Sequence, residues 1–344
     1  MAQQHMLLIY NPKAGKGLFL QSLGDTIDSF VKAGYKVEVY PTQEQGDATR
    51  KIARVPGYID LIVAAGGDGT LDEVITGLVI SGRDVPIGYI PVGSTNDYAA
   101  SLSVPTTIPE AVQYIVNGRP QAVDMGAFNE DTFVYVAAFG AFTDVAYDTN
   151  QDMKNAIGHL AYIIEGVKRL ADLKPYHMTV NVDGEEHQAS YIYGMVTNST
   201  SVGGIKGATG PNVYLDDGKF EALLIHMPKN IMELSEIGQA LLSYDFSNTE
   251  LVEYYKTEHI TFASDIPVPW TLDGEYGGKP ELVKIGVRHQ CVRLILSGDH
   301  NDVLGGWRNL KHPEEDEAVK SDEDIFLPLK TWTEELRRSL GFDD

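Results

Sequence analysis

The stretch that most limits how this chain can fold runs from Leu61 to Ile75 and reads LIVAAGGDGTLDEVI. Its apolar first half predicts a buried strand over Ile59 to Ala64, and the remainder predicts a helix from about Leu71. Three glycines stand where the strand becomes the helix, so the backbone can approach a ligand closely and point its N–H groups at a phosphate. Asp68, in the middle of this turn, would repel a bare phosphate. A Mg²⁺ ion between Asp68 and the phosphate would remove this repulsion.

The same alternation of strand and helix fills the first part of the chain. Short apolar strands are predicted over 6–10, 36–40 and 85–90, and each is followed by a polar loop and a helix. Such alternation is typical of a doubly wound, parallel α/β sheet, in which ligands bind beyond the carboxyl ends of the strands. The loops rich in Gly, Asp and Asn all fall on that edge.

After a predicted helix near 108–116, the pattern changes to many short strands joined by turns. This predicts a second, mainly antiparallel domain of the sandwich or barrel type, with inserted helices over 154–173 and 230–242. We place the boundary near 118–126. The predicted organisation is therefore an α/β domain over 1–124, a β-rich domain over 125–298 and an acidic extension over 299–344. A return of the chain to the first domain after about 298 remains open. The predicted strands of the second part are 133–139, 178–182, 190–197, 220–226, 259–263 and 282–296.

Charge and cysteine content exclude several classes of protein. The net charge of −22 argues against a nucleic-acid-binding protein, because phosphate contacts need clustered cations. Cys291 is the single cysteine, and the amino-terminal residues lack the features of a signal peptide, so we expect a reduced, cytoplasmic protein. No apolar run approaches the roughly 20 residues that span a bilayer, so any membrane association should be peripheral. The histidines form no HxxxH or Cys/His cluster, which argues against a zinc site.

Each loop motif has a structural alternative. Lys13 to Lys16 lacks the upstream glycine and the hydroxyl residue of a Walker P-loop, although Lys16 could still face a phosphate. The glycine turn at Asp68 could be simply a tight strand-to-helix connection. A dinucleotide-binding fingerprint is excluded, because the spacing of the glycines does not match it. The polar side chains of Gly93 to Asp97 could serve as helix caps. Asp273 to Glu275 could be a plain β-turn.

Four motifs occur in one order along the chain. They are Asn11-Pro-Lys-Ala-Gly15, Gly66-Gly-Asp-Gly-Thr70 with Glu73, Pro91-Val-Gly-Ser-Thr-Asn-Asp97 and Leu272-Asp-Gly-Glu275. In combination they resemble the diacylglycerol kinase, sphingosine kinase and NAD kinase superfamily, and specifically its soluble bacterial lipid kinases. The resemblance covers about residues 6–298. It implies an NAD-kinase-like α/β domain followed by a mainly antiparallel β-sandwich domain with inserted helices.

The resemblance also implies roles for particular residues. Asp273 matches the general base, and we group Glu275 and Asp68 with it as catalytic. Asp68 is the motif aspartate tied to Mg²⁺-ATP, and Asp97 would join the network of metal and water. Phosphoryl transfer itself requires charge neutralisation and an acidic group that accepts the proton of the attacking hydroxyl. We expect ATP contacts at Asn11, Lys16, Thr42, Gly66, Gly67, Asp68, Gly69, Thr70, Asp72, Glu73, Thr95 and Asn96.

A second metal loop is implied by the segment from Tyr214 to Phe220. It resembles the structural Mg²⁺ loop of the family, in which Asp217 would bind together with the carbonyl groups of Tyr214 and Lys219. Oxygen ligands of this kind suit Mg²⁺. The alternative is an Asp-Gly turn leading into a strand, and the adjacent Asp216 is an alternative ligand. Asp124 is a further candidate, because we expect it to follow a strand at the junction of the domains.

These observations lead to three hypotheses. The first is a lipid kinase that phosphorylates the hydroxyl of diacylglycerol with ATP and Mg²⁺, giving phosphatidic acid. The second is an NAD kinase, or a kinase of another lipid alcohol, and the third is a nucleotide-binding regulator whose acidic tail recruits partners. A basic amphipathic helix over 154–173, with Lys168 and Arg169, is the candidate for contact with an anionic membrane, although such a stripe more often packs on a core. Some soluble bacterial members of the family are homodimers, so a homodimer is an alternative to a monomer.

Overall fold

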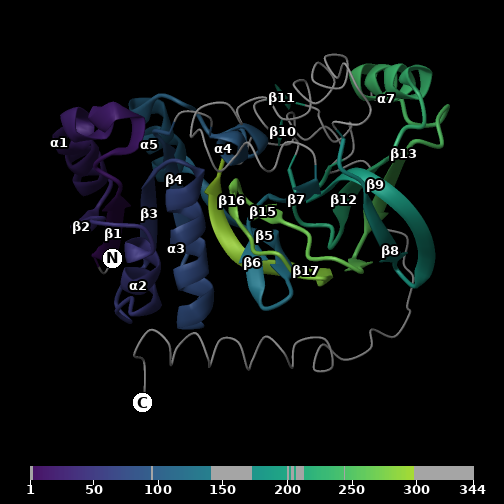
Figure 1. Ribbon diagram of the computed structural model, residues 1–344. Coiled ribbons are helices and arrows are strands. Elements are labelled where there is room, and N and C mark those ends of the chain that lie inside the picture. Colours follow the sequence, from purple (N-terminus) through teal and green to yellow (C-terminus); the bar gives the residue numbers. More distant parts are fainter. Residues whose placement is uncertain are drawn as a thin grey trace, which may run out of the picture.

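The computed structural model describes residues 3–93, 96–140, 173–199, 201–202, 205–206, 213–243 and 245–297. Its amino-terminal part contains four parallel strands in the order β4-β3-β1-β2 (Figure 1). The carboxyl ends of these strands lie at one edge, as the sequence predicts. The strands are β1 (Gln4–Tyr10), β2 (Tyr35–Pro41), β3 (Leu61–Gly66) and β4 (Ile87–Pro91).

Helices cover both faces of this parallel region. In β1, Leu7 and Ile9 share a core with residues of α2 (Asp47–Ala53) and α3 (Asp68–Ser81). Met6 and Leu8 share another core with residues of α1 (Leu18–Lys32) and α5 (Ile108–Asn117). Side chains of a strand alternate between its faces, so the two cores lie on opposite sides of the sheet. The helices are α1 (Leu18–Lys32), α2 (Asp47–Ala53), α3 (Asp68–Ser81) and α5 (Ile108–Asn117), with the short η1 (Ala14–Gly17) and α4 (Asp97–Ser101) at the strand ends.

The rest of the sheet is almost wholly antiparallel and encloses an aromatic core. Phe139, Phe262 and Trp270 pack there with ring centroids 4.8 to 5.6 Å apart. Together with the parallel region, this confirms the predicted fold class. The elements are β5 (Arg119–Phe128), β6 (Asp131–Phe133), β7 (Val136–Gly140), β8 (Tyr176–Val182), β9 (Glu185–Thr197), β10 (Ser201–Val202), β11 (Ile205–Lys206), β12 (Phe220–His226), α7 (Ile231–Ser243), β13 (Val252–Thr257), β14 (His259–Ser264), β15 (Trp270–Leu272), β16 (Glu275–Tyr276) and β17 (Leu282–Leu296).

The two regions form one continuous sheet, which we did not predict. β17 pairs with β14 and β5 in antiparallel fashion, and Leu294 near its end pairs in parallel with Ile87 of β4. Figure 1 shows β17 in yellow-green beside β5. The chain therefore returns to the parallel strands before residue 298. The predicted boundary at 118–126 overlaps β5, which runs beyond Asp124 instead of ending before it. The domain limits stay a prediction.

Two predicted segments lie outside the described residues. They are the amphipathic helix over 154–173, except for its last residue, and the acidic extension over 299–344. Within the part of the chain that the structure describes, no helix is both long and apolar enough to cross a membrane.

Candidate functional site

A cavity of about 730 Å³ opens at the carboxyl ends of the parallel strands. Its walls come from the loops after β1, β2 and β4, from the start of α3, and from the hairpin of β15 and β16. Segments more than 200 positions apart in the sequence therefore line one space, which has the size of a small-molecule site. The lining residues that we expected are Asn11, Thr42, Gly67, Gly69, Thr70, Glu73 and Glu275, joined by Lys13, Gln45, Gly93, Gly274 and Tyr276 among others.

The glycine turn brings two loops into close contact. A Cβ atom on Gly66 would lie 2.3 Å from Oγ1 of Thr70, and one on Gly93 would lie 2.6 Å from Cα of Gly67. Only glycine fits at either position without a shift of the backbone. The turn is followed at once by α3, and both Gly67 and Gly69 line the cavity. This is the arrangement that favours a phosphate at a helix amino terminus.

Asp68 holds the neighbouring loop. Its Oδ2 atom accepts a hydrogen bond from the amide of Asp97 at 3.0 Å, and its Oδ1 atom accepts one from the hydroxyl of Tyr89 at 3.4 Å. Burial, followed by the negative charge of Asp97, raises the pKa of Asp68 to about 6. Asn96 adopts a left-handed backbone conformation with φ of 54°, and its side chain donates to the carbonyl of Gly93 at 3.0 Å. Thr95, which we also expected at the site, lies outside the described residues.

The pair of carboxylates at Asp68 and Asp97 fits a hard cation that shares its ligands with a phosphate. Mg²⁺ is usually bound through one or two carboxylates together with substrate phosphates and water. No group of three or more His, Cys, Asp or Glu side chains arranged for a metal occurs among the described residues. These side chains therefore suit a Mg²⁺ ion that also binds phosphate oxygens and water, and not one that is enclosed by protein ligands alone.

Tyr89 is a part of the site that sequence reasoning missed. Its hydroxyl lies 3.4 Å from the carbonyl oxygen of Gly66 and 3.5 Å from Oδ1 of Asn96, in addition to its contact with Asp68. The residue is buried within β4, and burial raises the pKa of Tyr89. A tyrosine inside an apolar strand gives no sequence signal that distinguishes this role from ordinary core packing.

Glu73 acts on the start of α2. Its two carboxylate oxygens accept the amides of Gly46 at 2.8 Å and Ala48 at 3.1 Å. A carboxylate at a helix amino terminus satisfies amides that have no partner within the helix. We expected Glu73 to contact ATP; the structure shows that both oxygens position the loop before α2, while the side chain also lines the cavity.

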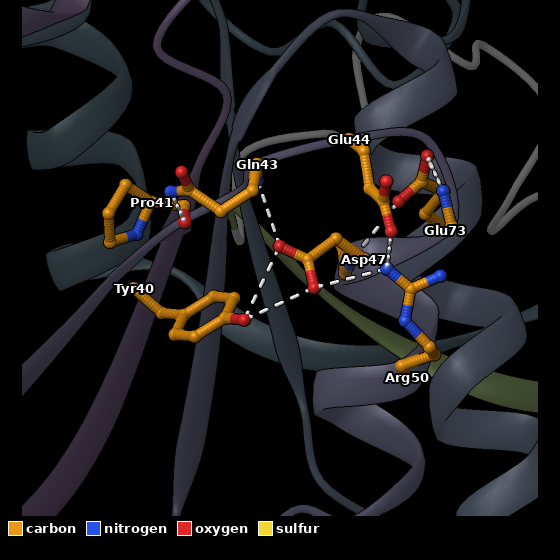
Figure 2. Close-up of polar contacts among 9 residues, drawn as sticks. Tyr40, Pro41, Gln43, Glu44, Asp47, Arg50 and Glu73 are labelled. Atoms are coloured by element: carbon orange, nitrogen blue, oxygen red, sulfur yellow. Dashed lines mark hydrogen bonds and ion pairs between the residues drawn. The ribbon is translucent and has the colours of Figure 1, made fainter.

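The loop after β2 is held in shape by a second set of polar contacts, shown in Figure 2. Asp47 accepts the amide of Gln43 at 2.8 Å and the hydroxyl of Tyr40 at 3.1 Å. Arg50 donates to Glu44 at 2.7 Å and lies 3.4 Å from Asp47. These contacts stabilise the wall of the cavity that Thr42 and its neighbours form. The side chain of Lys16, in η1, lies outside what the structure describes.

Asp273 lies at the tip of the hairpin between β15 and β16. It has φ of 50° and is followed by Gly274 with φ of 87°, as a two-residue Asp-Gly hairpin turn requires. Its carboxylate accepts the amides of Val134 at 2.5 Å and of Tyr135 and Val136 at 2.9 Å. Burial raises the pKa of Asp273 to about 7, the three amides lower it, and the charge of Asp68 raises it again. This geometry is compatible with a plain β-turn and also with a role of Asp273 as the general base.

Further acidic groups surround Asp273. Burial, followed by the charges of Asp273 and Glu275, raises the pKa of Asp72 well above its usual value. Nearby, the rings of Tyr98 and Tyr135 stack with centroids 6.1 Å apart. Several carboxyl groups thus share one buried region, where the charge of one raises the pKa of the next.

The predicted second metal loop has a positively charged side chain at its carboxylate. Oδ1 of Asp217 accepts the amide of Lys219 at 3.0 Å, and its Oδ2 lies 2.7 Å from the ammonium of Lys256. The ring of Tyr214 faces the same ammonium at 4.7 Å. Both oxygens of the predicted carboxylate ligand therefore have partners.

Asp124 is positioned as a structural link. Its carboxylate accepts hydrogen bonds from the amides of Gly218 and Gln290, both at 2.7 Å. Nδ1 of His289 lies 2.9 Å from its Oδ1 atom. We expected Asp124 to follow a strand, but it lies within β5 and is fully buried. It connects β5 to the loop before β12 and to β17, and it is not among the residues that line the cavity.

Comparison with known proteins identifies relatives along most of the chain. Residues 5–128 match the diacylglycerol kinase catalytic domain, and residues 136–296 match the YegS C-terminal NAD kinase beta sandwich-like domain. Diacylglycerol kinases of Staphylococcus saprophyticus and Bacillus subtilis are each 34% identical, over 79% of this chain and 89% of theirs. A crystal structure of a diacylglycerol kinase from Bacillus anthracis is similar with a TM-score of 0.68 at 25% identity, covering 87% of this chain and 98% of that one.

Proposed function

The chain belongs to the diacylglycerol kinase family, and on that premise we propose that it transfers the γ-phosphoryl group of ATP to the hydroxyl of diacylglycerol. The product would be phosphatidic acid. The kinase activity rests on the catalytic-domain match, and the names of the relatives support a lipid acceptor. The observation that carries the proposal is the meeting of the Asp273 hairpin and the glycine turn at one cavity.

Asp273 is the group suited to accept the proton of the attacking hydroxyl. A general base works best when its pKa is near the working pH, and the pKa of Asp273 is raised to about 7. Three backbone amides occupy part of its carboxylate, which has about four acceptor sites, so one site remains for the substrate hydroxyl. In the step, the hydroxyl oxygen bonds to the γ-phosphorus, the bond to the ADP oxygen breaks, and the proton passes to Asp273.

The glycine turn would bind the phosphates. The amides of Gly67 and Gly69 at the start of α3 would offer donors, and neither glycine has a side chain that would keep a phosphate away. Asp68 and Asp97 would hold Mg²⁺ jointly with the phosphate oxygens. When bound, Mg²⁺ neutralises charge on the transferring phosphoryl group. Asp68 additionally keeps the loop after β4 in place through the Asp97 amide.

The acceptor is the finer part of the proposal, because the second domain matches a description that includes NAD kinase. The test offers radiolabelled ATP with diacylglycerol in mixed micelles and, side by side, with NAD. We expect label in the lipid fraction only. Label in NADP would establish the NAD kinase alternative. Nucleotide binding without transfer to either acceptor would favour the regulator alternative.

A lipid acceptor implies work at a membrane surface, and we propose peripheral association. The net charge of −22 opposes contact with anionic lipids, so a local basic or apolar patch is needed. Our candidate, the helix over 154–173, lies outside the described residues. Co-sedimentation with anionic vesicles should fall in a Lys168→Glu/Arg169→Glu variant, and unchanged binding would remove this helix from consideration. A homodimer likewise stays a prediction.

A further inference from the structure

The loop from Tyr214 to Lys219, which we call the 214–219 loop, already holds a positive charge at its carboxylate. The ammonium Nζ of Lys256 lies 2.7 Å from Oδ2 of Asp217. It also lies 4.7 Å from the centre of the Tyr214 ring, a distance typical of a cation–π contact. Since Oδ1 of Asp217 accepts the Lys219 amide, no oxygen of this carboxylate is left without a partner. The loop thus has its counter-charge within the chain.

The register of two strands fixes this position. In the antiparallel pair of β12 and β13, Lys256 stands directly opposite Glu221. The ammonium lies 3.5 Å from Oε1 of Glu221, whose side chain is only 1% exposed. Both carboxylate oxygens of Glu221 are buried, and burial raises the pKa of Glu221 to about 8 while the charge of Lys256 lowers it. A cation is therefore placed between the carboxylate of the loop and a buried carboxylate beneath it.

A divalent ion at the same place would be opposed by this ammonium. Mg²⁺ requires oxygen ligands close to it in near-octahedral geometry, and Asp217 is the only carboxylate of the predicted ligand set. An ion bound to Asp217 would stand beside Lys256, and like charges at such distances repel each other. We propose that in this chain the ammonium of Lys256 takes the place of Mg²⁺ in the 214–219 loop, which therefore keeps its shape without a divalent ion.

The consequence reaches the junction of the two halves of the sheet. The amide of Gly218 in the loop donates to Asp124 at 2.7 Å, and the amide of Asp124 donates to the carbonyl of Leu215 at 2.7 Å. Fixing the loop with Lys256 thus also fixes its attachment to β5. The inference concerns the stability of the fold and does not depend on the proposed function.

Thermal unfolding of the full chain without nucleotide, in EDTA and in excess MgCl₂, tests the proposal. We expect Lys256→Met to lower the unfolding midpoint by about 3 °C in EDTA, because Asp217 loses its counter-charge. The matched control is Lys284→Met, an exposed lysine on β17, which should change the midpoint by less than about 1 °C. Wild type and Asp217→Asn should respond equally to MgCl₂.

Three results would overturn the proposal. The first is a stabilisation of wild type by MgCl₂ that Asp217→Asn abolishes, because it would place the ion at this loop. The second is a Lys256→Met variant that unfolds at the wild-type temperature. The third comes from the double variant Asp217→Asn/Lys256→Met: if its loss equals the sum of the two single losses, the side chains are not coupled.

Discussion

The side chains of Gln45 and Glu275 meet in a hydrogen bond of 2.7 Å between Nε2 and Oε2, although 230 positions separate them in the chain. Gln45 belongs to the loop after β2 and Glu275 to the hairpin that carries Asp273. Oε1 of Glu275 also lies close to Gly69, since a Cβ added there would be 3.5 Å from it. The bond therefore connects the nucleotide side of the cavity with the predicted base.

We predict that Gln45→Ala weakens this connection without affecting the fold. The bond is exposed, so its loss should leave the unfolding temperature within about 1 °C of wild type. The Michaelis constant for ATP should rise by roughly threefold to tenfold, because a bond of about 1 kcal/mol orders the cavity wall. Gln113→Ala, on an exposed position of α5, is the control. An unchanged Michaelis constant in Gln45→Ala would show that the bond has no part in binding.

Asp68→Asn separates the two roles of this residue. The amide oxygen of asparagine can still accept the Asp97 amide, so the variant should stay folded. Loss of the charge should reduce kcat by about a hundredfold or more, because the carboxylate pair can no longer hold Mg²⁺ with the phosphates. Steady-state kinetics at several Mg²⁺ concentrations measure the effect. Wild-type kcat with unchanged Mg²⁺ dependence would limit Asp68 to positioning the loop.

Two glycine substitutions of the same kind should have opposite effects. In Gly93→Ala the added Cβ would lie 2.6 Å from Cα of Gly67, so one loop must shift and ATP binding should weaken by about tenfold or more. In Gly24→Ala, within α1, nothing lies within 4 Å of the added atom. That variant should be stabilised by about 0.5 to 1 kcal/mol with unchanged ATP affinity. Calorimetric titration with an ATP analogue and chemical unfolding give both quantities, and equal affinities would contradict the close packing of the loops.

Activity should depend on pH through Asp273. A general base must be deprotonated, so a base whose pKa is about 7 loses activity as the pH falls below 7 and reaches a plateau above it. The value of kcat/KM should drop by about tenfold per pH unit on the acid side. Asp68, with a pKa of about 6, should steepen the profile at still lower pH. A flat profile between mildly acidic and neutral pH would exclude a base with this pKa.

The sequence predicted the elements whose signal is local. The glycine turn and the alternation of strands and helices depend on short spacings, and the structure has them at those places. The β-turn that we considered at Asp273 is also present, as the turn of a hairpin. It did not predict relations set by long-range register. The pairing of Leu294 with Ile87, which joins the two regions, and the placement of Lys256 opposite Glu221 both depend on how distant strands align.

The sequence also could not predict which groups the site residues hydrogen-bond to. The motif aspartate Asp273 was identified, but backbone amides carry no residue-specific signal, so its bonds to Val134 and the two residues after it could not be inferred. The resemblance likewise pointed to a metal at Asp217. The ammonium that occupies its oxygen comes from a strand almost forty positions later.

The most direct test of the account is single-turnover transfer from radiolabelled ATP to diacylglycerol in mixed micelles by wild type and Asp273→Asn. Because Asp273 also binds three amides, unfolding temperature and ATP affinity are measured on the same preparations. The account predicts a loss of about 10²- to 10⁴-fold in the rate of transfer, with ATP affinity close to wild type and a folded variant. A folded Asp273→Asn variant that transfers phosphate within about threefold of the wild-type rate would contradict it, since general-base catalysis by this group would then be absent.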